Sequence, residues 1–150
     1  MIYAASKLDP VLLADDSADD VFFFQRGAVA AQLPNPIAVA QDGDEAIQWL
    51  EQTIATPSAR LPVVALLDLK MPRRSGFDVL SWIRSHPVPV VRHTPVVIFT
   101  SSKESPDIRR AYALGANGYL VKPVGVDALT DLVRGLNLFW AGLNARDLAP

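Results

Sequence analysis

The fold of this 150-residue chain is decided by one stretch, Val63-Val64-Ala65-Leu66-Leu67-Asp68-Leu69-Lys70-Met71-Pro72. Its first five residues are all apolar, which is typical of a strand covered on both faces inside a parallel sheet. Asp68 follows at the carboxyl end of that strand, where open parallel sheets collect ligands and reactive groups. Pro72 prevents a helix and Gly76 permits a turn. Asp68 is therefore either a reactive group at the mouth of a loop or an ordinary residue that caps a turn.

Strand and helix patterns alternate along the whole chain. Short apolar runs predict strands at residues 10–14, 37–41, 63–67, 95–99 and 119–121. Helical periodicity predicts helices at residues 17–33, 44–53, 77–84, 106–114 and from 126 onward, with residues 85–94 as a connector. This alternation predicts an α/β fold, a doubly wound five-stranded parallel sheet with right-handed crossovers and helices on both faces.

Composition limits the protein class. Half of the residues are apolar, one fifth are charged and the net charge is -2, which is typical of a globular chain without an electrostatic footprint for nucleic acid or an anionic membrane. The absence of cysteine excludes disulfides and thiol catalysis. No membrane span or signal peptide is recognisable, so we expect a cytoplasmic protein. We expect a lead-in at 1–9, one domain at 10–143, a tail at 144–150 and no output domain.

Reactive side chains follow four of the five predicted strands. They are Asp15-Asp16, Asp68, Thr100-Ser101 and Lys122, and in a parallel sheet all of them lie on one edge. Carboxylates grouped in this way repel one another unless a cation is present. They suit Mg²⁺, with Mn²⁺ or Ca²⁺ as substitutes. An Asp nucleophile, a metal, a lysine and a hydroxyl are the parts needed to form an aspartyl phosphate.

These motifs, in this order and at these spacings, resemble the response-regulator receiver domains of two-component phosphorelays. The resemblance is carried by Ala14-Asp15-Asp16-Ser17, by Asp68-Leu69-Lys70-Met71-Pro72 with Gly76, by Phe99-Thr100-Ser101 and by Lys122-Pro123. It implies a flavodoxin-like receiver fold and a phosphoprotein that is not an enzyme. The start of the first helix, the long connectors and the ending around residues 136–140 also resemble single-domain regulators paired with bacterial phytochromes. Sensor histidine kinases, among them bacteriophytochromes, are therefore the implied partners.

The resemblance also implies a role for each matched residue. Asp68 is the implied phosphoacceptor, with Asp16 as a direct metal ligand, Asp15 acting through water and the Lys70 carbonyl as a backbone ligand. The implied contacts to the phosphoryl group come from Thr100, Ser101, Lys122 and the Met71 backbone. Thr100 and Tyr119 form the implied switch. The peptide bond between Lys122 and Pro123 is expected to be cis, so that the lysine ammonium is directed at the site.

Two apolar surfaces are candidates for partner contacts. Val21, Phe24 and Ala28 already supply the inward face of the first helix, so either Phe22 or Phe23 should be partly exposed, as a kinase docking face or within a wider buried stripe. Residues Tyr112, Phe139 and Trp140 are candidates for homodimer contacts or, for the last two, for core packing.

Two other functions fit the strand-end aspartate. A phosphohydrolase with an Asp nucleophile needs a second Asp two residues later as an acid–base catalyst, and Lys70 stands at that position. A nucleotide or flavin binding module needs a glycine-rich loop after the first strand, where this chain has Asp15-Asp16-Ser17. We therefore prefer the phosphoacceptor interpretation to both.

Overall fold

The computed structural model describes residues 9–147, in which strands and helices alternate. In chain order the elements are β1 (Val11–Ala14), α1 (Ala18–Ala30), β2 (Ile37–Ala40), α2 (Gly43–Ala55), β3 (Val64–Leu67), α3 (Gly76–Arg84), α4 (Pro89–Arg92), β4 (Val96–Thr100), α5 (Ser105–Ala113), β5 (Gly118–Val121) and α6 (Val126–Asp147). None of the helices in this part of the chain has the length and apolarity needed to cross a membrane.

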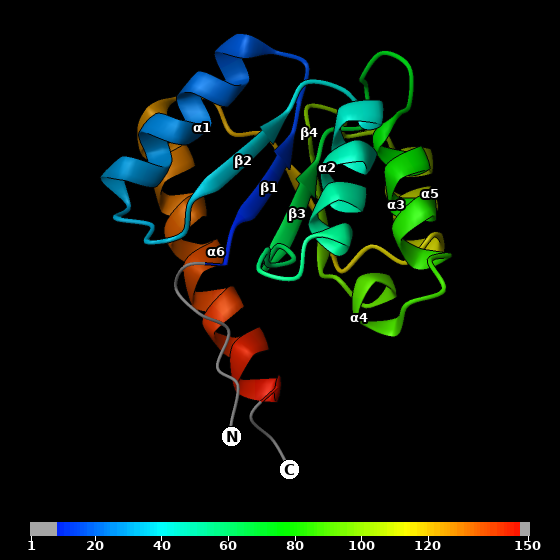
Figure 1. The fold of residues 1–150 in the computed structure, drawn as a ribbon. Coiled ribbons are helices and arrows are strands. Elements are labelled where there is room, and N and C mark those ends of the chain that lie inside the picture. Colours follow the sequence, from blue (N-terminus) through cyan, green and yellow to red (C-terminus); the bar gives the residue numbers. More distant parts are fainter. Residues whose placement is uncertain (1–8, 148–150) are drawn as a thin grey trace.

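The five strands form one parallel sheet in the order β2-β1-β3-β4-β5. Helices α1 and α6 cover one face, and α2, α3 and α5 cover the other (Figure 1). The strand order is that of flavodoxin-like folds, in which ligands bind where the order reverses, between β1 and β3. The predicted doubly wound five-stranded sheet is confirmed.

The core consists of two apolar layers, because successive residues of a strand point to opposite faces of the sheet. Val11 and Leu13 of β1 pack on the layer shared with Phe24 and Leu129 of α1 and α6. Leu12 and Ala14 pack on the opposite layer with α2 and α3. The stretch that begins at Val63 is buried on both faces, as its unbroken apolar run predicts. Asp68 is therefore attached to one of the most rigid parts of the molecule.

Two segments differ from the expectation drawn from the sequence. The connector at residues 85–94 contains the one-turn helix α4, with Pro89 at its first position, where a missing N–H costs nothing. Four residues are too few to show a helical period, so the pattern gave no signal. The last helix continues to Asp147, beyond residue 143. The expected boundaries of the domain and its tail stay predictions.

Candidate phosphoacceptor site

The alternation of side chains along the strands brings three reactive residues to the same side of the sheet. Asp15, Asp68 and Lys122 each stand an even number of residues after a side chain that packs in the layer of α1 and α6. The backbone carries this register across the sheet edge, because Asp68 N–H donates to the Ala14 carbonyl at 2.9 Å. The three side chains therefore meet beside α1, above the buried core.

Lys122 is the centre of this group. Its Nζ lies 2.7 Å from Asp15 Oδ2, 2.7 Å from Asp20 Oδ2 and 2.8 Å from Asp68 Oδ2. The side chains of Lys122, Asp15 and Asp68 are only 11%, 2% and 10% exposed. Burial alone would lower the pKa of Lys122, but its hydrogen bonds to the three carboxylates outweigh burial and raise that pKa above its usual range. The lysine is therefore held as a buried ammonium.

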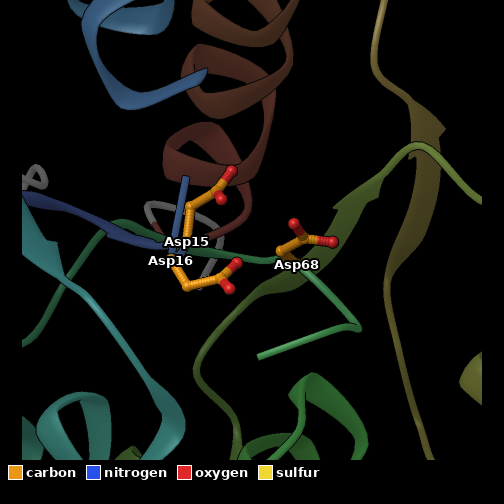
Figure 2. Close-up of side chains that lie close together, drawn as sticks. All are labelled: Asp15, Asp16 and Asp68. Carbon is orange, nitrogen blue, oxygen red and sulfur yellow. The ribbon is translucent and has the colours of Figure 1, made fainter. Parts of the chain in front are cut away.

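Asp15, Asp16 and Asp68 form a group that can hold a metal ion. One carboxylate oxygen from each lies within 4.8 Å of the others. Figure 2 shows that Asp15 and Asp16 leave the end of β1 in different directions, with Asp68 opposite them. Burial raises the pKa of Asp15, and Lys122 only partly offsets that shift. With Asp20 included, four carboxylates lie at the site, three of them within hydrogen-bond distance of the Lys122 ammonium, and an all-oxygen donor set with excess negative charge fits a hard divalent cation.

The loop after β3 folds back on the candidate acceptor and needs glycine to do so. A Cβ atom at Gly76 would lie 2.2 Å from the backbone oxygen of Asp68, a distance that no side chain tolerates. Ser75 caps α3 through a capping box with Asp78. Gly76 and this cap start α3 directly against the site. Lys70 in the intervening loop is exposed, and it lines a hollow of about 600 Å³ together with Asp16, Asp20, Asp68, Thr100, Ser101, Ser102, Lys103, Glu104 and Lys122.

The expected switch residues lie on the opposite side of the sheet. Thr100 is buried, and its Oγ1 accepts from Ser102 N–H at 3.4 Å, while Ser101 is exposed at the mouth. The Tyr119 hydroxyl donates to the Ser102 carbonyl at 2.9 Å. Burial raises the pKa of Tyr119, so it is a neutral donor at ordinary pH. Ser102 therefore joins Thr100 at the end of β4 to Tyr119 on β5.

The expected cis peptide bond between Lys122 and Pro123 is wrong, because no described residue has a cis bond. A trans bond is the preferred isomer even before proline. Lys122 N–H pairs with the Thr100 carbonyl at 2.8 Å, so the sheet register already places the lysine. Its long side chain then reaches the carboxylates without any help from the isomer of the following bond.

Asp20 is the residue that sequence reasoning missed. It lies in the acidic first turn of α1, where its N–H donates to the cap Ser17. Its carboxylate nevertheless reaches across to Lys122. The signal that could have found it is positional, because the first turn of α1 starts beside Asp15 and faces the side of the sheet that carries Lys122.

The structure describes the predicted partner residues of α1 and α5. Phe22 and Phe23 are 53% and 46% exposed, so both lie open, and Phe23 borders a hollow of about 110 Å³ next to Lys122, Pro123 and Val126. Tyr112 is also exposed. The side chains of Phe139 and Trp140 lie outside the described residues.

Comparison with known proteins gives one consistent family. The family described as "Response regulator receiver domain" matches residues 11–134. The response regulator Rcp1 of Synechocystis sp. is 30% identical over 130 residues, which are 87% of each chain.

Solved structures agree with that match. The phosphorylated cyanobacterial phytochrome response regulator RcpA superposes with a TM-score of 0.77 at 30% identity, over 89% of this chain and 94% of that one. The Mn²⁺-bound form of Rcp1 superposes with a TM-score of 0.75 at 29% identity and the same coverage. A divalent ion is thus known in a protein of similar fold and length.

Proposed function

The chain belongs to the response regulator receiver domain family, and we propose that it accepts a phosphoryl group from a sensor histidine kinase on Asp68. One observation carries the proposal. Asp68 lies at the end of a buried central strand with the Lys122 ammonium 2.8 Å from its carboxylate and two further acidic groups beside it. A nucleophilic carboxylate with a fixed cation next to it is suited to an acyl phosphate, whose formation depends on positioning and charge stabilisation.

Each residue contributes a distinct part of the transfer. An Asp68 oxygen attacks the phosphorus of a phosphohistidine, the P–N bond breaks, and the histidine keeps the bonding electrons. Lys122 donates hydrogen bonds to the transferred oxygens, and the backbone N–H near Met71 and the hydroxyl of Ser101 supply further donors. The rigid strand under Asp68 keeps the nucleophile in place while these contacts form.

The carboxylates of Asp16 and Asp68 and the Lys70 carbonyl would hold Mg²⁺, with Asp15 acting through water. A bound magnesium ion supplies charge neutralisation for the oxygens of the transferring group. The donors themselves support this assignment, because they are hard oxygen ligands that carry more negative charge than Lys122 balances. In addition, Asp15 is too buried for water to screen its charge. Mn²⁺ or Ca²⁺ would occupy the same donors.

We further propose that phosphorylation acts on partners through Thr100 and Tyr119. A phosphoryl group on Asp68 gives the Thr100 O–H a new acceptor, and movement of the hydroxyl toward it lengthens the bond that the Thr100 oxygen accepts from Ser102 N–H. Because the Ser102 carbonyl also accepts from the Tyr119 hydroxyl, a shift of the loop after β4 changes the position of this side chain on β5. The local charge change thereby biases two arrangements of the β4–α5 loop.

The partner we propose is a sensor kinase of the phytochrome type in the cytoplasm. The relatives named for phytochromes support this choice, and the exposed Phe22 and Phe23 offer an apolar face beside the site. A homodimer through the exposed Tyr112 face and the end of α6, where Phe139 and Trp140 lie, is a second expected contact.

Labelling with acetyl phosphate and Mg²⁺, followed by intact mass measurement, tests the proposal. The wild type should gain one phosphoryl group and Asp68→Asn none. Asp42→Asn is a matched control, since Asp42 is another buried aspartate at the same sheet edge but caps α2 outside the cluster. Labelling of Asp68→Asn at the wild-type rate would reject Asp68 as acceptor. Multiple turnovers on generic phosphomonoesters would favour the phosphohydrolase alternative instead.

A further inference from the structure

Lys122 has more acidic neighbours than the proposed transfer requires. A lysine ammonium has three N–H bonds, and three carboxylates, those of Asp15, Asp20 and Asp68, lie within hydrogen-bond distance of it. All three donors are therefore occupied. The ammonium can bond to an oxygen on a phosphorylated Asp68 only when one of these contacts is released.

Asp20 differs from the other two carboxylates in its position. Asp15 and Asp68 come from strand ends and belong to the group that can hold a metal, whereas Asp20 comes from α1 and lies outside that group. Its side chain is 40% exposed, compared with 2% and 10% for the other two. Asp20 also lines both the acidic hollow over Asp68 and the apolar hollow beside Phe23. It therefore stands at the entrance to the site.

We propose that Asp20 is a positioning residue that restrains Lys122 in the unphosphorylated protein and slows phosphoryl transfer to Asp68. This inference rests on the proposed function and concerns its rate. The Asp20 carboxylate holds one N–H of Lys122 toward α1, and its charge repels an incoming anionic donor. With acetyl phosphate, the bond from phosphorus to the acetate oxygen breaks as the bond to Asp68 forms, and acetate leaves with the electron pair. Lys122 then turns one N–H from Asp20 to a phosphoryl oxygen and keeps all its protons.

A purely structural role of Asp20 in α1 can be separated from an effect on Lys122, because the chain offers a matched control. Asp19 precedes it in the same first turn of α1, so both residues favour the positive end of the helix dipole equally. Asp19 is exposed, and among the described residues its carboxylate has no ion-pair partner. Asp19→Asn therefore removes the same charge from the same turn without touching Lys122.

The test compares initial labelling rates of the full-length wild type, Asp20→Asn, Asp20→Glu and Asp19→Asn, each at its own saturating Mg²⁺ concentration. Asp20→Asn should be labelled by acetyl phosphate about three- to fivefold faster than wild type, as expected for one partly exposed charge near a reacting anion. Asp19→Asn should stay within about twofold of wild type, and Asp20→Glu should restore the slow rate. The gain should be smaller with phosphoramidate, which carries less negative charge, and a structural role would not produce that difference.

Several results would overturn the restraint. It fails if Asp20→Asn is no faster than Asp19→Asn, or if Asp20→Glu is as fast as Asp20→Asn. Thermal melts check folding first, and Asp20→Ser replaces Asp20→Asn if that variant does not fold, because serine is accepted in a first helical turn. If neither the wild type nor Asp19→Asn is labelled by either donor, the proposed function fails, and the restraint fails with it.

Discussion

Two cationic side chains at opposite edges of the sheet form their hydrogen bonds with different kinds of oxygen. Lys122, at the carboxyl edge, is bound by three carboxylates. Arg84, at the amino edge, is bound by neutral oxygens only: it donates to the carbonyls of Gly115, Arg92 and Thr94 and to Asn117 Oδ1, at 2.7–2.9 Å. In the part of the chain that the structure describes, no carboxylate pairs with Arg84, and burial lowers its pKa.

The difference shows which cation can change partners. The carbonyls around Arg84 belong to the backbone of α4, of the segment before β4 and of the turn before β5, so they cannot leave without unfolding that edge. The carboxylates around Lys122 are side chains that a metal ion or a phosphoryl group can compete for. We therefore expect changes at Arg84 to affect stability and changes at Lys122 to affect chemistry.

The largest expected effect is the loss of labelling in Lys122→Gln. Removing a positioned donor from a charged transition state costs on the order of 100-fold in rate, so acetyl phosphate labelling should fall by about that factor. Lys122→Gln also leaves the buried carboxylates of Asp15 and Asp68 without their cation, which lowers stability, so labelling is compared at saturating Mg²⁺ in samples that melting curves show to be folded. Lys103→Gln is the control, since Lys103 lines the same hollow without an ion pair in the described residues. Near-normal labelling of Lys122→Gln would show that the Lys122 ammonium does not act on the transferred group.

The second prediction is that a change at Arg84, on the amino edge of the sheet, lowers stability and leaves the labelling rate unchanged. Arg84→Met removes four hydrogen bonds, two of them to the part-buried carbonyls of Arg92 and Thr94, and the free energy of unfolding should fall by about 2–3 kcal/mol in urea titrations. The labelling rate of the folded protein should remain within about twofold of wild type. Arg109→Met, at an exposed arginine of α5, should cost almost nothing. A stable Arg84→Met variant with slow labelling would show that the amino edge also governs the chemistry.

The same contrast explains what the sequence could reveal. Asp15, Asp68 and Lys122 could be predicted because each directly follows an apolar run that predicts a strand, and strand register brings them together. Asp20 and Arg84 act across elements, and no local pattern tells which contact a charged residue on a helix makes. Helix α4 is too short to show a helical period, and Arg84 of α3 donates a hydrogen bond to the Arg92 carbonyl at its end. Long-range polar contacts are therefore the part of this fold that sequence periodicity does not encode.

The third prediction concerns metal and pH at the carboxyl edge. Mg²⁺ at about 100 times its dissociation constant should stabilise the protein by about 2.7 kcal/mol, seen as a higher melting temperature. Burial raises the pKa of Asp15 above the ordinary aspartate value of 3.8, so on acidification the folded state binds a proton at Asp15 at a higher pH than an ordinary aspartate does. Protons and metal compete for the site. The stabilisation by Mg²⁺ should therefore shrink on acidification at pH values above 3.8.

Asp15→Asn is the control for this pH effect, because it removes the titrating group and leaves the rest of the site. Its smaller stabilisation by Mg²⁺ should show a weaker dependence on pH. If the stabilisation of the wild type by Mg²⁺ stayed constant until the pH reached the usual titration range of aspartate, Asp15 would not take part in metal binding. Arg84→Met should keep the wild-type pH profile, since no carboxylate of residues 9–147 pairs with the guanidinium.

The smallest expected effect is a difference in stability loss between alanine substitutions at two glycines, one next to Arg84 and one that follows Lys122. Gly115 and Gly125 both have a positive φ, +100° and +95°, so alanine is strained at either position by about 1–2 kcal/mol. A Cβ atom at Gly115 would lie 3.1–3.3 Å from the Arg84 side chain, whereas at Gly125 it would meet nothing within 4 Å. Gly115→Ala should therefore be the more destabilising of the two in urea titrations, by a few tenths of a kcal/mol, about the lower end of the cost of overpacking. Equal losses would mean that Arg84 yields easily, and the amino edge would then be less rigid than its four hydrogen bonds indicate.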